Sequence, residues 1–99
     1  MAEIKLEPAE GKYSAFNMYD GNTKVGEMVI SISGNQLTVY HTEVNPAAEG
    51  KGYAKQLLEA MVIYARENKL AVIPLCPFVS AQFKRHPELY ADLWREQLA

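Results

Sequence analysis

The chain has 99 residues, of which 48% are hydrophobic, and its formal net charge is −2. This length excludes a second domain, so we expect one domain over residues 1–99. The nearly balanced charge argues against nucleic acid as the main partner. The lone cysteine, Cys76, cannot form an internal disulfide, and no paired Cys/His spacing predicts a metal site. No apolar window is long enough to span a membrane, so we expect a cytoplasmic protein.

The first half of the chain predicts three antiparallel strands. An extended run over residues 12–19 ends near an Asp-Gly dipeptide, which is typical of tight hairpin turns. Residues 23–33 alternate apolar and polar side chains, as a half-buried strand does. A second tight turn follows at Gly34, and residues 37–44 return as a strand rich in β-branched and aromatic side chains. We therefore expect an antiparallel meander.

After that strand, the apolar side chains recur with a helical period. Residues 50–68 carry an apolar stripe along one helical face, which predicts a helix. Residues 70–75 form a short apolar run, consistent with a buried strand that this helix returns parallel to residues 37–44. Pro74 and Pro77 interrupt the run. Because proline cannot donate to a sheet ladder, we expect the two strands to part there.

Two further helices are predicted near the C-terminus, one over residues 79–85 and one that begins at Pro87. In the second helix, Leu89, Leu93 and Trp94 should share one face. The apolar side chains of this segment either pack against the sheet or form a dimer patch, so a monomer and a weak homodimer both stay open. The predicted order is β-β-β-α-β-α-α, an α+β fold.

The turn before the long helix has the features of an anion-binding site. Gly50 and Gly52 lack a Cβ, so their N–H groups can approach a bulky anion, and the free N–H groups of the first helical turn add a positive dipole end. Lys51 and Lys55 lie one turn apart and can reach phosphate oxygens. We interpret this turn as a pyrophosphate cradle; the alternative is a flexible helix start that serves packing. The sequence lacks Gly-x-Gly-x-x-Gly and Gly-x-x-x-x-Gly-Lys-Ser/Thr, so dinucleotide and nucleoside triphosphate folds lose their main support.

Two motifs carry a resemblance to a known family. Residues 49–54, Glu-Gly-Lys-Gly-Tyr-Ala, resemble the acyl-CoA pyrophosphate motif of the Gcn5-related N-acetyltransferases. Glu49 stands where that family commonly has a basic or amide residue. His-Thr-Glu-Val at residues 41–44 and Pro-Leu-Cys-Pro-Phe at residues 74–78 are similar to small, single-domain members of the superfamily. The resemblance covers about residues 12–90.

The resemblance implies a minimal acetyltransferase fold that transfers an acetyl group from acetyl-CoA to an amine that the sequence does not identify. It places the pantetheine arm of CoA in the gap between the third and fourth predicted strands, along the backbone of residues 43–45. There, the N–H of Val44 would polarise the thioester carbonyl. The expected cofactor-binding residues are Val44, Gly50, Lys51, Gly52, Tyr53, Ala54 and Lys55.

Acyl transfer also needs a base for the incoming ammonium and an acid for the leaving thiolate. His41 and Glu43 alternate onto one side of the third strand beside the gap, and either can accept a proton, although both are also ordinary polar residues at a strand end. Cys76 lies just before a helix start, where the helix dipole favours a thiolate. Four roles of Cys76 stay open: a residue that lines the thioester pocket, a proton donor, an acceptor of the acyl group, or a small core residue without a part in the reaction. His86 fits a helix boundary better than a catalytic role.

Larger members of the family often protonate the thiolate with a tyrosine on the helix after the fourth strand, but here Phe83 occupies that position. Tyr90 would replace it only if the last helix folds back. This difference supports a second hypothesis, a non-catalytic module that binds acetyl-CoA or CoA. A third hypothesis is a purely structural domain, but it gives no function to the glycine turn. Because the chain lacks room for helices and a strand that commonly shape the acceptor site, we expect that site to be open or completed by another subunit.

Overall fold

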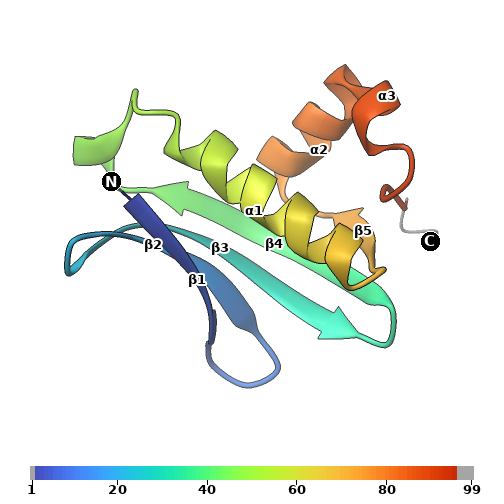
Figure 1. Ribbon diagram of the computed structural model, residues 1–99, viewed down its shortest axis with the longest axis horizontal. Coiled ribbons are helices and arrows are strands. Elements are labelled where there is room, and N and C mark those ends of the chain that lie inside the picture. The colour runs from blue at the N-terminus through green and yellow to red at the C-terminus, as the bar shows by residue number, and fades with distance from the viewer. Residues whose placement is uncertain (1, 96–99) are drawn as a thin grey trace.

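A computed structural model of the chain describes residues 2–95. A five-stranded mixed sheet lies at its centre, in the order β1-β2-β3-β4-β5 (Figure 1), which confirms the predicted α+β class. No helix in this part of the chain has both the length and the apolar character needed to cross a membrane. The elements are β1 Ala2–Pro8, β2 Ser14–Asp20, β3 Thr23–Ser33, β4 Gln36–Val44, the 3-10 turn η1 Pro46–Ala48, α1 Tyr53–Glu67, β5 Ala71–Pro74, α2 Pro77–Arg85 and α3 Pro87–Tyr90.

The predicted antiparallel meander is present as β2, β3 and β4. Its two turns place Gly21 at φ 63° and Gly34 at φ 58°, a left-handed backbone that glycine adopts without steric penalty. The predicted order lacks one strand, however. The N-terminal strand β1 was not predicted, and it pairs antiparallel with β2 along its whole length. Apolar residues at positions 2, 4 and 6 of β1 alternate with charged ones at 3, 5 and 7, and Ala2 and Ile4 pack against the core. This alternation is the signal that predicts a half-covered edge strand.

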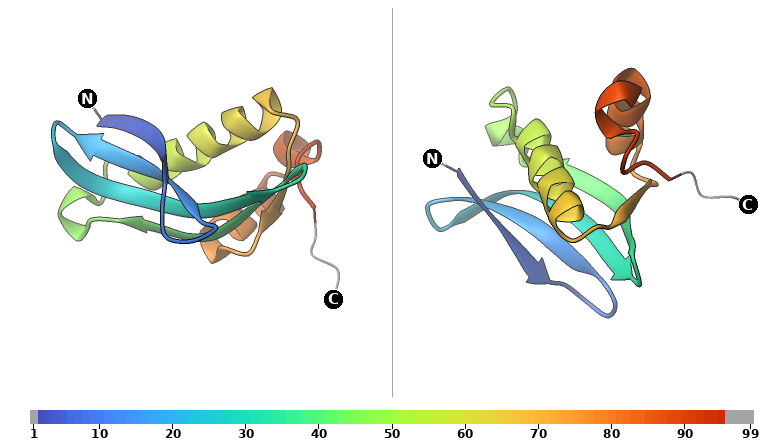
Figure 2. Two further views of the ribbon diagram at one scale, coloured as in Figure 1. Left: turned by 90° about the horizontal axis from the view of Figure 1, so that it is seen from below. Right: turned by 45° about the vertical axis from the view of Figure 1, so that its right-hand side comes forward.

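β5 pairs in parallel with β4, and α1 forms the crossover between them (Figure 2). The pairing ends at Val39 and Pro74. One further hydrogen bond joins the two segments, from the N–H of Cys76 to the carbonyl of Val39 at 2.9 Å. Beyond it, β4 continues to Val44 while the other segment turns into α2. The predicted parting of the strands near Pro74 is therefore confirmed.

A β-bulge in β4 changes which of its side chains face the core. Val29 of β3 pairs with His41, whereas Ile30 pairs with Val39, so Tyr40 is an extra residue in β4. Val39 is fully buried in the core. After the bulge, the even-numbered residues of β4 take over the core-facing side, and the odd-numbered ones face away from α1.

α1 packs its apolar stripe onto the sheet, and its buried residues are Leu57, Leu58, Met61, Val62 and Ala65. The helix begins at Tyr53, three residues later than predicted. Gly50 at φ 84° and Gly52 at φ 74° have a left-handed backbone, which a right-handed helix cannot include. The glycine turn is therefore a loop that leads into the helix rather than its first turn.

The segment after α2 differs from the prediction. α3 is a single turn that ends at Tyr90, so Leu89, Leu93 and Trp94 do not share a helical face. Leu93 is 4% exposed, whereas Leu89 is 54% exposed. Trp94 lies beside β5 and forms a parallel bridge with Val72. The expected packing against the sheet thus applies to part of this segment only.

Phe83 connects the C-terminal segment to the core. Its side chain is fully buried, stacks on Tyr90 with ring centroids 4.6 Å apart, and contacts the edge of Trp94. We expect Phe83→Ala to lower the free energy of unfolding by about 3–5 kcal/mol, because it removes buried apolar area and leaves a cavity. Urea unfolding measures this. The exposed Leu89 is a control, since Leu89→Ala should change stability by about 0.5 kcal/mol or less; equal losses in the two variants would contradict this role of Phe83.

Candidate functional site

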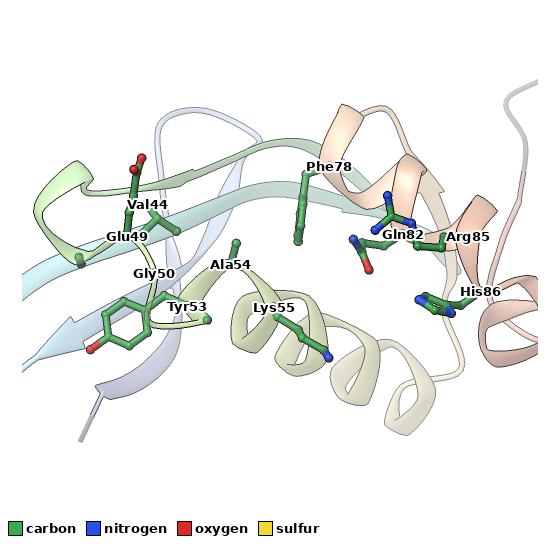
Figure 3. A pocket seen from close by; sticks show the side chains of 12 residues that line it. Val44, Glu49, Gly50, Tyr53, Ala54, Lys55, Phe78, Gln82, Arg85 and His86 are labelled. Carbon is green, nitrogen blue, oxygen red and sulfur yellow. The ribbon is translucent and has the colours of Figure 1, made fainter.

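A cavity of about 490 Å³ opens between the first turn of α1 and one face of α2 (Figure 3). Its volume lies within the range of small-molecule sites, roughly 300–1,000 Å³. The end of β4, the loop before α1, and both helices contribute to its wall. The lining residues are Val44, Ala48, Glu49, Gly50, Gly52, Tyr53, Ala54, Lys55, Phe78, Gln82, Arg85 and His86.

The first turn of α1 offers unpaired hydrogen-bond donors at this cavity. Gly52 is the N-cap, and the first helical hydrogen bond runs from the N–H of Gln56 to the carbonyl of Gly52 at 3.1 Å. The N–H groups of Tyr53, Ala54 and Lys55 precede this bond and have no acceptor within the helix. A Cβ built on Gly50 or Gly52 would meet no atom within 4 Å, so there is open space beside the turn. Free N–H groups and the positive helix end together favour an anion here.

Six of the seven cofactor-binding residues predicted from the sequence line this cavity: Val44, Gly50, Gly52, Tyr53, Ala54 and Lys55. Lys51 does not line it and is exposed. The expectation that Lys51 reaches the same space as Lys55 is therefore not supported by the geometry. Lys51 precedes the helix, in the turn between the two left-handed glycines, so the spacing of four residues does not place both side chains on one helical face.

Four lining residues on α2 and at its end were not predicted as binding residues. Phe78, Gln82 and Arg85 are spaced by four and three residues, so they share one face of α2, and His86 follows. Figure 3 shows the Phe78 ring between the α1 turn and α2, with Gln82, Arg85 and His86 on the side toward which Lys55 extends. Lys55 and Arg85 thus bring two cations to the cavity, against the single carboxylate of Glu49.

The free edge of β4 adds a backbone donor. The N–H of Asn45 donates to the carbonyl of Val25 on β3 at 2.8 Å. Because successive residues of a strand direct their N–H groups to opposite edges, the N–H of Val44 is directed to the edge that β5 has left. The side chain of Val44 lines the cavity. A backbone N–H is therefore available between the parted strands, as the resemblance implied.

His41 and Glu43 lie on the side of the sheet that faces away from α1. Their neighbour Thr42 pairs with Met28, which is fully buried in the core, so the two flanking side chains point the other way. They are in contact, with His41 Nε2 3.3 Å from Glu43 Oε2, and their side chains are 57% and 67% exposed. Neither lines the cavity between α1 and α2. The expected pairing on one side is present, but it is on the opposite face from the cavity.

Cys76 is buried at the point where the strands part. Cys76 as a whole is 2% exposed. Its Sγ lies 3.4 Å from Thr42 Oγ1, to which the thiol can donate a hydrogen bond. It is also the N-cap residue of α2. Of the roles left open by the sequence, this burial does not fit a thiol that lines an open thioester pocket in the free protein. Thr42 and the start of α2 cover it, which is the environment of a small core residue.

This burial changes the expected reactivity of the thiol. We expect Cys76 in the folded protein to react with a small maleimide far more slowly than in urea, and acetyl-CoA to change that rate little. Cys76→Ala should lower stability by roughly 1 kcal/mol or more through the cavity it leaves. Mass spectrometry of the alkylated protein over time measures the rate. Fast alkylation of the native protein that acetyl-CoA suppresses would contradict this and return the thiol to an open pocket.

Phe83, at the position of the family's tyrosine, and Tyr90, its possible replacement, both lie away from the cavity. Phe83 is fully buried, and Tyr90 stacks on it rather than lining the cavity. Tyr53 is the one tyrosine of the lining within the described part of the chain. Residues 2–95 also contain no group of three or more His, Cys, Asp or Glu side chains that could hold a metal ion.

Two solved structures have a fold similar to that of this chain. The NMR structure of a GCN5-like protein from Staphylococcus aureus is similar to this chain, with a TM-score of 0.66 and 28% identity over 97% of this chain and 90% of that one. The crystal structure of a ribosomal-protein-alanine N-acetyltransferase from Brucella melitensis has a similar fold, with a TM-score of 0.60 and 20% identity over 85% of this chain and 64% of that one. No curated protein matches the chain significantly.

A family model described as GCN5-related N-acetyl-transferase matches residues 15–93. The chain belongs to this family, which places it among the acetyltransferase enzymes. The resemblance inferred from residues 41–54 and 74–78 is therefore confirmed.

Proposed function

We propose that the protein transfers an acetyl group from acetyl-CoA to a small or peptide amine, and that the cavity between α1 and α2 holds the CoA. The observation that carries this proposal is the set of free N–H groups at the first turn of α1, which opens into a cavity bordered by Lys55 and Arg85. Such a surface suits a pyrophosphate, whose charge is spread over several oxygens. Membership of the acetyltransferase family supports the choice of donor.

The free edge of β4 suits the thioester end of the donor. With the pyrophosphate at α1, the pantetheine arm would lie along residues 43–45, in the gap that β5 leaves. The N–H of Val44 would then donate to the thioester carbonyl and stabilise the negative charge that forms on its oxygen when the amine attacks. This is the same strand edge that the parting at Pro74 exposes.

The amine would approach from the opposite face of the sheet. Glu43 lies there, in contact with His41, and we assign it the role of base that removes a proton from the ammonium, directly or through water. The amine nitrogen bonds to the carbonyl carbon, the C–S bond breaks, and the sulfur leaves as a thiolate that takes up a proton. Water in the open cavity supplies that proton, because Cys76 is buried and does not line the cavity.

The absence of an α2 tyrosine from the cavity favours one second candidate, a module that binds acetyl-CoA or CoA without transferring the acetyl group. Calorimetry with acetyl-CoA, followed by mass spectrometry of a panel of small amines and peptides, separates the two. We expect saturable binding that weakens as salt rises, since Lys55 and Arg85 contribute through charge, and an added acetyl mass on at least one amine. Binding without any acetylated amine would support the second candidate. The proposal places this activity in the cytoplasm, where a lone thiol such as Cys76 stays reduced.

A further inference from the structure

An apolar groove lies between α1 and α3, away from the cavity described above. Its volume is about 270 Å³, and it shares no lining residue with that cavity. Ile63 and Leu89, both in its wall, are 57% and 54% exposed, which makes them the two most exposed large apolar side chains in residues 2–95. Exposed apolar side chains gathered in one groove are typical of an interaction surface.

The α1 side of this groove has a symmetric sequence. Glu59, Val62, Ile63 and Arg66 are spaced by three, one and three residues, so they form one stripe along the helix. A two-fold axis between Val62 and Ile63 would bring Glu59 of one copy to Arg66 of the other, and Val62 to Ile63. The charges of the stripe are therefore complementary in antiparallel orientation, and Ile63 supplies most of its apolar contact because Val62 is only 5% exposed.

The charged ends of the stripe are suited to such a contact. Arg66 is held by Asp92, with 3.0 Å from Nε to Oδ2 and 3.2 Å from Nη2 to Oδ1, and Nη2 also donates to the carbonyl of Leu89. The hydrogen bond from Arg66 keeps the pKa of Asp92 below its usual value, so this pair stays charged at neutral pH. Nη1 of Arg66 and the carboxylate of Glu59 have no hydrogen-bond or ion-pair partner within residues 2–95.

We propose that a second copy of this chain docks in this groove, with α1 packed antiparallel against α1 of the other copy. Such an interface is isologous, so each copy contributes the same residues and the contact closes as a dimer. Few large apolar side chains are exposed here, in contrast to obligate dimers, so the association is reversible. The stripe begins at Glu59, one helical turn beyond Lys55, and the dimer therefore leaves the cavity at the start of α1 accessible.

Sedimentation velocity over a range of protein concentrations tests this proposal. The unmodified protein should shift from monomer toward dimer as its concentration rises. Ile63→Asp should stay monomeric at every concentration, because it places two carboxylates in the apolar centre of the interface. Ile32→Asp is the matched control, since Ile32 is 40% exposed but lies on β3, and it should dimerise as the unmodified protein does. An unmodified protein that stays monomeric, or an Ile63→Asp variant that still dimerises, would overturn the proposal.

A charge exchange tests the orientation and does not depend on Ile63. Glu59→Arg alone places arginine against arginine, and Arg66→Glu alone places glutamate against glutamate, so each variant should be monomeric. An equimolar mixture of the two restores both opposite-charge contacts and should form a heterodimer. Thermal unfolding shows whether each variant is folded. A dimer from either variant alone, or no dimer from the mixture of two folded variants, would contradict the antiparallel arrangement.

Discussion

Gly52→Glu is expected to abolish the binding of acetyl-CoA while the protein stays folded. The new side chain extends from the N-cap of α1 into open space beside the free N–H groups, where the proposed pyrophosphate sits. Because contact between like charges costs several kcal/mol, affinity should fall by at least about a hundredfold, at about 1.4 kcal/mol for each factor of ten. Isothermal titration calorimetry measures the change. The negative charge is itself favourable at a helix N-terminus, so the helix should persist.

Gly11→Glu is the matched control for this variant. Gly11 also has a left-handed backbone, with φ 60°, and open space around its missing Cβ, but it lies in the turn between β1 and β2. Both variants therefore carry a similar backbone strain, about 1–2 kcal/mol for a residue with a side chain, and only one places charge in the cavity. Equal affinities for acetyl-CoA in the two variants would remove the α1 turn from the proposed site.

Glu43→Gln is expected to lower kcat by about a hundredfold or more, the usual range for the loss of one acid-base group. The amide keeps the shape of the side chain but cannot accept the proton of the ammonium. Because Glu43 faces away from the cavity, affinity for acetyl-CoA should stay unchanged. Steady-state kinetics with the best amine of the panel, together with calorimetry, separates turnover from binding.

Two further variants assign the role of Glu43. His41→Ala removes the imidazole that contacts Glu43 at 3.3 Å, and a smaller loss than that of Glu43→Gln is expected if His41 only positions the carboxylate. Glu10→Gln removes an exposed carboxylate in the turn between β1 and β2 and should leave kcat unchanged. If Glu43→Gln left kcat unchanged, another group would be the base. If His41→Ala lowered kcat more than Glu43→Gln did, that base would be the imidazole of His41.

The part of the site that local chain geometry determines could be predicted from the sequence. A glycine turn between a strand and an amphipathic helix requires little tertiary information, and Gly50, Gly52 and the residues that follow lie at the cavity as expected. The parting of β4 and β5 follows equally from the inability of Pro74 to continue the ladder. β1 was within reach of the same reasoning, since its alternating pattern is local.

The part that depends on packing could not be predicted. Phe78, Gln82 and Arg85 form one face of α2, and the spacing identifies the face but not what lies opposite it, which depends on how α2 packs beside α1. The burial of Cys76 depends on Thr42, which is 34 residues away in the chain. The bulge at Tyr40 reverses the alternation of β4, and no residue type in the strand marks its position.

An amide NMR titration with acetyl-CoA tests the central claim, that the first turn of α1 binds the donor, most directly. Saturable shifts should concentrate at the amides of Gly50, Gly52, Tyr53, Ala54 and Lys55, because their N–H groups surround the proposed pyrophosphate position. The amides of Gly11 and Gly34, in turns away from the cavity, should not move. If acetyl-CoA caused no saturable shift, or if its shifts lay elsewhere and spared the α1 turn, the proposed donor site would be wrong.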